Sequence, residues 1–160
     1  MKKLLALAFV CSALSAQAGI GETKQQVEAR YGKPVTAGTK PVSGIGDLGL
    51  AYNWKEYFVV VTYLDGRCVH EIISRQDDKR ILIPEIESLL KLQGNGFKRG
   101  KDKVSEDGKN EMKVWEAPNN DRALYYRDKV ASKKSEYMLV IESGKYRDLA
   151  EAPKKGTKAK

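Results

Sequence analysis

The sequence predicts an α+β fold, a tandem αβββ repeat whose mostly antiparallel sheet carries two short helices on one face. Each half of the chain, about residues 21–76 and 82–143, contains one helix signal followed by three strand-like runs. A glycine ends each predicted helix and a tryptophan follows at a similar distance, 22 residues from Gly32 to Trp54 and 21 from Gly94 to Trp115. The matched order and spacing favour two copies of one unit.

The first predicted helix covers about nine residues after Thr23. Thr23 and Gln26 have the spacing of a capping box, in which each side chain satisfies a free amide of the first turn. Gly32 suits the left-handed residue that ends a helix, and Pro34 prevents its continuation.

The second predicted helix begins at Pro84, a residue type that fits the first helical position. Ile86, Leu89 and Leu90 then lie on one face of the helix, which ends before Gly94.

Six runs have the composition of strands. They are Leu48 to Trp54, Tyr57 to Leu64, Arg67 to Ser74, Glu111 to Glu116, Arg122 to Arg127 and Tyr137 to Glu142. Asp65-Gly66 is the strongest hairpin signal in the chain, and Pro118-Asn119-Asn120 predicts a turn between two later strands.

Residues 21–34, read as GETKQQVEARYGKP, resemble the opening helix of small envelope proteins of the SmpA/OmlA type. The shared features are a glycine-threonine entry, a central valine and a terminal glycine-lysine-proline. The tandem helix-plus-three-strand layout is similar to that of beta-lactamase inhibitor protein. This resemblance implies a binding scaffold rather than an enzyme. Members of the first group are lipoproteins that assist outer-membrane assembly, whereas this chain lacks a convincing lipidation site.

Residues 1–18 have the pattern of a signal peptide. Lys2 and Lys3 precede an apolar stretch, and Ala16-Gln17-Ala18 provides the small residues that a signal peptidase requires. We therefore expect cleavage after Ala18 and export to the periplasm or the exterior. No stretch reaches the roughly 20 apolar residues of a spanning helix, so no transmembrane segment is expected.

The rest of the chain reads as a single αβββ-αβββ domain, 19–150, followed by a disordered Lys-rich tail, 151–160. Cleavage removes two lysines and no acid, so the net charge falls from +8 to +6. For an exported basic protein we expect an envelope or secreted protein as partner, or an anionic polymer or lipid head groups, and no nucleic acid.

Few residues offer catalytic or metal-binding chemistry. Cys68 and His70, two apart in a predicted strand, are expected on one face with α carbons about 6.6 Å apart. That is too far for a nucleophile and its base without a lean of the side chains. One cysteine and one histidine do not make a zinc site, and no cofactor is expected. Cys68 has no partner for an internal disulfide after cleavage, and it is a buried small hydrophobe, a reactive thiol or one half of an intermolecular bridge.

Aromatic residues are the better candidates for binding: Trp115, Tyr57, Tyr63 and Tyr126. Trp115 shares its strand face with Glu111 and Lys113, so alternation predicts a partly exposed ring; the alternative is that it caps a small satellite core. The run 57–64 is apolar on both faces, which predicts a strand covered on both sides. One cover is the helix layer, and the other is a loop, a second subunit or a partner.

These observations favour an exported noncatalytic binding module that acts on an envelope or secreted protein. One alternative is a small secreted hydrolase that uses carboxylates, which would require a concave pocket with two acids of raised pKa. Another is a peripheral binder of anionic polymer that uses the tail lysines Lys154, Lys155, Lys158 and Lys160.

Overall fold

The computed structural model describes residues 19–41, 43–104, 111–128 and 136–152. The predicted signal peptide and residues 153–160 of the predicted tail lie outside this part. The described elements, in chain order, are α1 (Lys24–Tyr31), β1 (Leu48–Trp54), β2 (Tyr57–Leu64), β3 (Arg67–Arg75), α2 (Ile83–Leu92), β4 (Lys98–Arg99), β5 (Lys103–Val104), β6 (Glu111–Glu116), β7 (Arg122–Asp128), β8 (Glu136–Glu142) and α3 (Gly144–Glu151).

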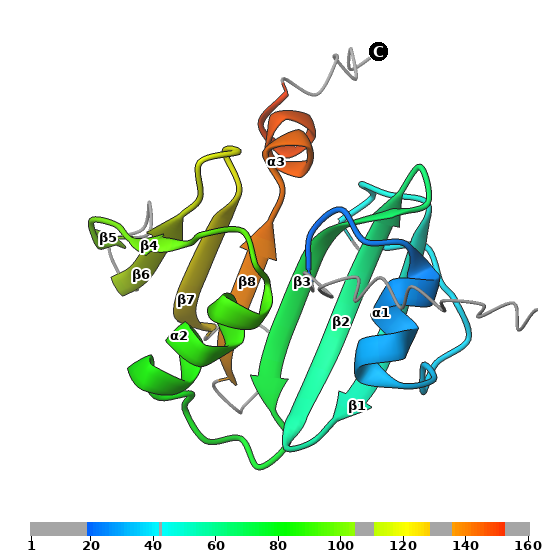
Figure 1. Ribbon diagram of the computed structural model, residues 1–160, viewed down its shortest axis with the longest axis horizontal. Coiled ribbons are helices and arrows are strands. Elements are labelled where there is room, and N and C mark those ends of the chain that lie inside the picture. Colours follow the sequence, from blue (N-terminus) through cyan, green and yellow to red (C-terminus); the bar gives the residue numbers. More distant parts are fainter. Residues whose placement is uncertain (1–18, 42, 105–110, 129–135, 153–160) are drawn as a thin grey trace, which may run out of the picture.

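The strands form one open sheet in the order β1-β2-β3-β8-β7-β6-β4, with β5 paired to β6 (Figure 1). Every described pair of strands is antiparallel, which confirms the predicted α+β class and the antiparallel sheet. The last long strand of each half, β3 and β8, meet at the centre of the sheet. Their register places Ile73 opposite Leu139.

Helices α1 and α2 lie over the same face of the sheet, as the sequence predicts (Figure 1). The capping box at the start of α1 is confirmed, with the Thr23 hydroxyl accepting from the Gln26 N–H. Gly32 follows α1 with φ 87°, a conformation that favours glycine. The hairpin turn between β2 and β3 also forms, since Asp65 and Gly66 both have positive φ, 52° and 71°.

A third helix, α3, follows β8 and was not predicted. The Ser143 hydroxyl caps it by accepting from the Tyr146 N–H. Tyr146, Leu149 and Ala150 have helical spacing, but Gly144 and Tyr146 are the buried residues of the helix, and Leu149 is 47% exposed. It ends at Glu151, the first residue of the predicted tail.

The core lies between the sheet and the two covering helices. Tyr57, Val59, Val61 and Tyr63 of β2 face the helices and are at most 4% exposed, which settles the face that the sequence left open. The side chains that alternate with them point to the opposite face, where Phe58 is 37% exposed.

Replacing Leu139 by alanine tests the position of this core. Leu139 is 0% exposed in the central strand β8, so the cavity should cost about 2–5 kcal/mol of unfolding free energy. Leu149 on α3 is 47% exposed, and its replacement by alanine should change that energy by no more than about 0.5 kcal/mol. Urea unfolding of both variants gives the comparison. Equal, small losses would contradict a core centred on β8.

Candidate functional site

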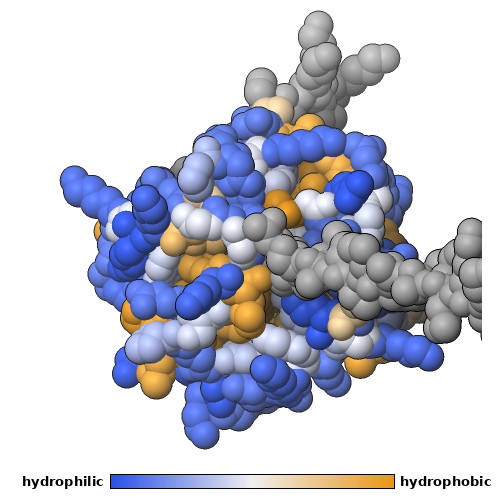
Figure 2. Space-filling view, viewed as in Figure 1, coloured by the Kyte–Doolittle hydropathy of each residue, from blue (hydrophilic) through white to orange (hydrophobic). Residues whose placement is uncertain are grey.

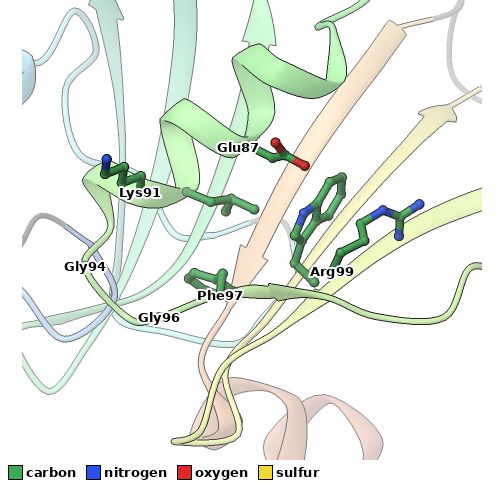
Figure 3. Close-up of a pocket in the computed structure, with 8 residues that line it drawn as sticks. Glu87, Lys91, Gly94, Gly96, Phe97 and Arg99 are labelled. Carbon is green, nitrogen blue, oxygen red and sulfur yellow. The ribbon is translucent and has the colours of Figure 1, made fainter.

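A pocket of about 480 Å³ opens between α2 and the strands β4 and β6 (Figure 3). Its volume falls within the range of small-ligand and anchor pockets. The residues that line it are Glu87, Leu90, Lys91, Gly94, Gly96, Phe97, Arg99 and Trp115. We call it the α2 pocket.

The apolar wall of the α2 pocket is formed by Leu90, Phe97 and Trp115. The Arg99 guanidinium lies over the Trp115 ring, 4.7 Å from its centroid. Its Nη1 donates to the backbone oxygens of Gly100 and Val114, and its Nη2 pairs with Asp102. Arg99 is therefore held in place as part of the wall.

Trp115 also contributes a polar atom without a partner. Its Nε1 is fully buried, and the described residues offer it no hydrogen-bond acceptor. A buried donor left unpaired costs about 1–3 kcal/mol, and because this nitrogen is fully buried, a ligand in the pocket does not reach it in this structure.

Charged side chains surround the apolar wall. In Figure 3, Glu87 and Lys91 project from α2, and Arg99 comes from the strand on the other side. Figure 2 shows hydrophobic residues gathered near α2, with hydrophilic residues around them.

The segment that continues from the pocket, residues 98–103, has the sequence KRGKDK and exposes Lys98, Lys101 and Lys103. Its single acid, Asp102, is paired with Arg99 and with Lys113.

A smaller groove of about 270 Å³ lies on the other face of the sheet. Its floor includes Val60, Thr62, His70 and Ile72, and one side is formed by Thr36, Thr39, Lys40, Pro41 and Ser43. The His70 ring stacks on Tyr146 of α3, with the ring centroids 4.4 Å apart. Burial lowers the pKa of His70, and the nearby Glu142 acts against this shift. The loop thus covers part of the second face of β2, and α3 packs against the neighbouring strand β3.

The four aromatic candidates do not form one site. Tyr57, Tyr63 and Trp115 lie on the helix-facing side at 4%, 2% and 2% exposure, whereas Tyr126 is half-buried on the opposite side of the sheet. The Tyr57 hydroxyl donates to Glu85, and the Tyr63 and Tyr52 hydroxyls share a hydrogen bond. Among the four, Trp115 alone lines the α2 pocket.

The expectation of a partly exposed Trp115 ring is wrong. Trp115 shares a face with Lys113, as alternation predicts, but α2, Phe97 and Arg99 cover only the Trp115 end of that face. Val114 on the other face is also 0% exposed. Alternation cannot identify a solvent face where a strand is covered on both sides.

The expectation that Cys68 and His70 share a face is also wrong. A β-bulge pairs Thr62 with His70 and Tyr63 with Cys68, which leaves one extra residue on β3 and reverses the alternation. The Cys68 thiol points to the helix side, where its Sγ lies 3.7 Å from Glu71. Burial, and secondarily the Glu71 carboxyl, raise the pKa of Cys68 well above its usual value. The buried alternative for this cysteine is therefore the one the structure supports.

A buried polar cluster was missed by sequence reasoning. Glu71 on β3 is 0% exposed and accepts from Arg30 Nη2 at 3.1 Å, Tyr31 Oη at 3.2 Å and Gln93 Nε2 at 2.8 Å. Arg30 Nη2 also bonds Glu22 at 2.6 Å. Burial raises the pKa of Glu22, and Arg30 opposes this shift. The only available signal was the position of Glu71 two residues before Ile73, on the strand face that carries the core.

Comparison of the chain with protein families, with curated proteins and with solved structures found no match. No helix in the described ranges is both long and apolar enough to cross a bilayer. Within the same ranges, no three His, Cys, Asp or Glu side chains gather as a metal site would require.

Thiol labelling tests the buried state of Cys68, the only cysteine from Gly19 onward. We expect a thiol-reactive disulfide reagent to modify the native protein far more slowly than the urea-unfolded protein. An opening free energy of only ~3 kcal/mol already slows the reaction on the order of a hundredfold. Equal rates in the two states would show a reactive thiol instead.

Proposed function

We propose that this protein is an exported, noncatalytic binding module that holds an acidic segment of an envelope or secreted protein in the α2 pocket. The observation that carries the proposal is an apolar pocket with a basic border. Cleavage of the leader after Ala18 belongs to the proposal, because the leader is the feature that indicates export.

The pocket has the anatomy of a protein-binding hot spot. Tight interfaces depend on a few anchors that fill desolvated pockets, while charged groups lie at the rim. Leu90, Phe97 and Trp115 would enclose one apolar side chain of the partner.

The charge around the pocket favours an acidic partner segment. Lys91 stands at the opening, and Lys98, Lys101 and Lys103 extend from it along the edge of the sheet. Opposite charges on a partner would speed its association and fix its orientation.

The two alternatives gain less support from these residues. A carboxylate hydrolase needs paired acids of raised pKa in a cavity, whereas Glu87 is the one acid that lines the α2 pocket. Among the described residues, the carboxylic acid whose pKa is raised is Glu22, which belongs to the polar cluster and lines neither the α2 pocket nor the groove. An anionic polymer would use the lysines but would have no need of the apolar wall.

A tandem origin of the two halves is part of the same proposal. The support is that each half has a helix followed by a three-stranded meander, and that the last strands, β3 and β8, meet antiparallel at the centre. Such a layout is in keeping with the resemblance of the sequence to a binding scaffold.

Peptide binding tests the proposed function. Two fluorescent peptide sets of equal length would carry a central Leu, Phe or Tyr, one set with acidic flanks and one with basic flanks. We expect fluorescence anisotropy to detect binding of the acidic set only, weakening as salt screens the charges. Lys91→Glu, Lys98→Glu and Phe97→Ala should each weaken it by about tenfold or more.

Lys33→Glu is the matched control, because Lys33 is exposed and follows α1 rather than lining the pocket. It makes the same charge change and should leave binding within twofold. Binding that survives Phe97→Ala but disappears with salt would favour the polymer alternative. Failure of every acidic peptide to bind would refute the proposed site.

A further inference from the structure

We propose that the polar cluster contains a built site for the α-ammonium group that cleavage after Ala18 creates on Gly19. This inference rests on the export and cleavage in the proposed function, and it assigns a role to residues that the α2 pocket does not use. Hydrolysis of the Ala18–Gly19 peptide bond adds a hydroxyl to the Ala18 carbonyl, and the released Gly19 nitrogen takes up protons. A neutral amide is thereby replaced by a cation.

Gly19 is buried and held in position by the segment that follows it. The Glu22 N–H donates to the Gly19 oxygen at 3.1 Å. The Gly21 N–H donates to the Cys68 oxygen at 2.7 Å, and the Cys68 N–H returns a bond to Glu22 at 2.8 Å. Residues 19–22 thus run against the start of β3, which fixes the nitrogen of Gly19 at the edge of the cluster.

Gln93 presents an unused acceptor to Gly19. A Cβ added at Gly19 would lie 2.0 Å from Gln93 Oε1 and 3.2 Å from the Gln93 backbone oxygen, so a larger residue there would displace Gln93. Gln93 Nε2 donates to Glu71, which directs Oε1 to the opposite side. This Oε1 is fully buried and has no donor among the residues that the structure describes. An ammonium on Gly19, with three N–H groups, can supply one.

Within the described part of the chain, the polar cluster also contains two buried carboxyl groups but only one cationic side chain, Arg30. Glu22 and Glu71 both bond the single guanidinium of Arg30, and their carboxyl groups are 8% and 0% exposed. A backbone hydrogen bond from Gly19 already reaches the Glu22 carboxyl, where it lowers a pKa that burial raises. A cation at the same nitrogen would give two carboxylates two positive partners, which buried acids require.

The pH dependence of stability then differs between the two forms of the chain. Glu22 bonds the Gly19 N–H, and the other titratable groups of the cluster are Glu71, Arg30, Tyr31 and Cys68. In the mature form, the carboxylates raise the ammonium pKa above its unfolded value of about 8. The stability from this pair is complete below that value and is lost as pH rises through the raised folded pKa. Without the ammonium, burial raises the pKa of Glu22 above its usual value of 4.5, so the stability linked to its protonated form is lost as pH rises from that value through the raised folded pKa.

The test compares two exported chains that differ by one residue. One begins at Gly19, and the other retains Ala18, which moves the ammonium about 3.8 Å along the chain. NMR titration of the labelled first residue gives the amine pKa in each chain. We expect an upward shift of at least about one unit, a tenfold change in the ionisation constant, for the chain that begins at Gly19. The Ala18 chain should keep a value near 8.

Glu22→Gln in the chain that begins at Gly19 should remove most of that shift. Glu28→Gln is the matched control, since Glu28 lies on α1 and pairs with exposed Lys24. If Glu22→Gln prevents folding, the difference in amine pKa between the chain that begins at Gly19 and the chain that retains Ala18 still tests the site. Equal amine pKa values in the two chains, or an equal loss with both glutamine variants, would overturn the proposed site.

Failure of this inference can be told apart from failure of the proposed function. Mass spectrometry of the exported protein shows whether the chain begins at Gly19, and peptide binding at the α2 pocket is measured separately. A chain that begins elsewhere after export contradicts both the cleavage and the ammonium site. A chain that begins at Gly19 with an ordinary amine pKa contradicts the ammonium site alone.

Discussion

The buried carboxylate of Glu71 is the interaction on which the arrangement of the helices depends. It bonds Arg30 and Tyr31 of α1 and Gln93 at the end of α2, so one side chain of β3 holds both helices against the sheet. Removing one partner of a buried ion pair costs about 3–5 kcal/mol, because the remaining charge stays without compensation. The geometry of this cluster is therefore strongly constrained.

The cluster also helps to order one wall of the α2 pocket, because Gln93 directly precedes the loop that lines it. Gln93 is tied to Glu71, and two residues later Asn95 Nδ2 donates to Asp121 at 2.9 Å. The loop that supplies Gly94, Gly96 and Phe97 to the pocket thus begins between two fixed points. A wall that is already ordered loses little conformational entropy when a partner binds.

The sequence predicts the local elements well because their signals are local. The capping box at Thr23, the turn at Asp65-Gly66 and the six long strands depend on neighbours in the chain. Burial of Trp115 and the opposite faces of Cys68 and His70 depend on elements distant in the sequence and on a bulge, which no period of two reveals. Glu71 was missed for the same reason, since its partners are 22 to 41 residues away. The α2 pocket is lined by residues of α2 and β6, which are distant in the sequence, so no local pattern could predict it.

A double-mutant cycle between Arg30 and Glu71 tests the central claim most directly. The unfolding free energies of Arg30→Met, Glu71→Leu and the double variant would be measured in urea. If the buried pair holds the helices, Arg30→Met alone should cost about 3–5 kcal/mol, and the double variant should lose less than the two single losses combined by about 1–3 kcal/mol. Strictly additive losses, or a small loss for Arg30→Met, would contradict the account.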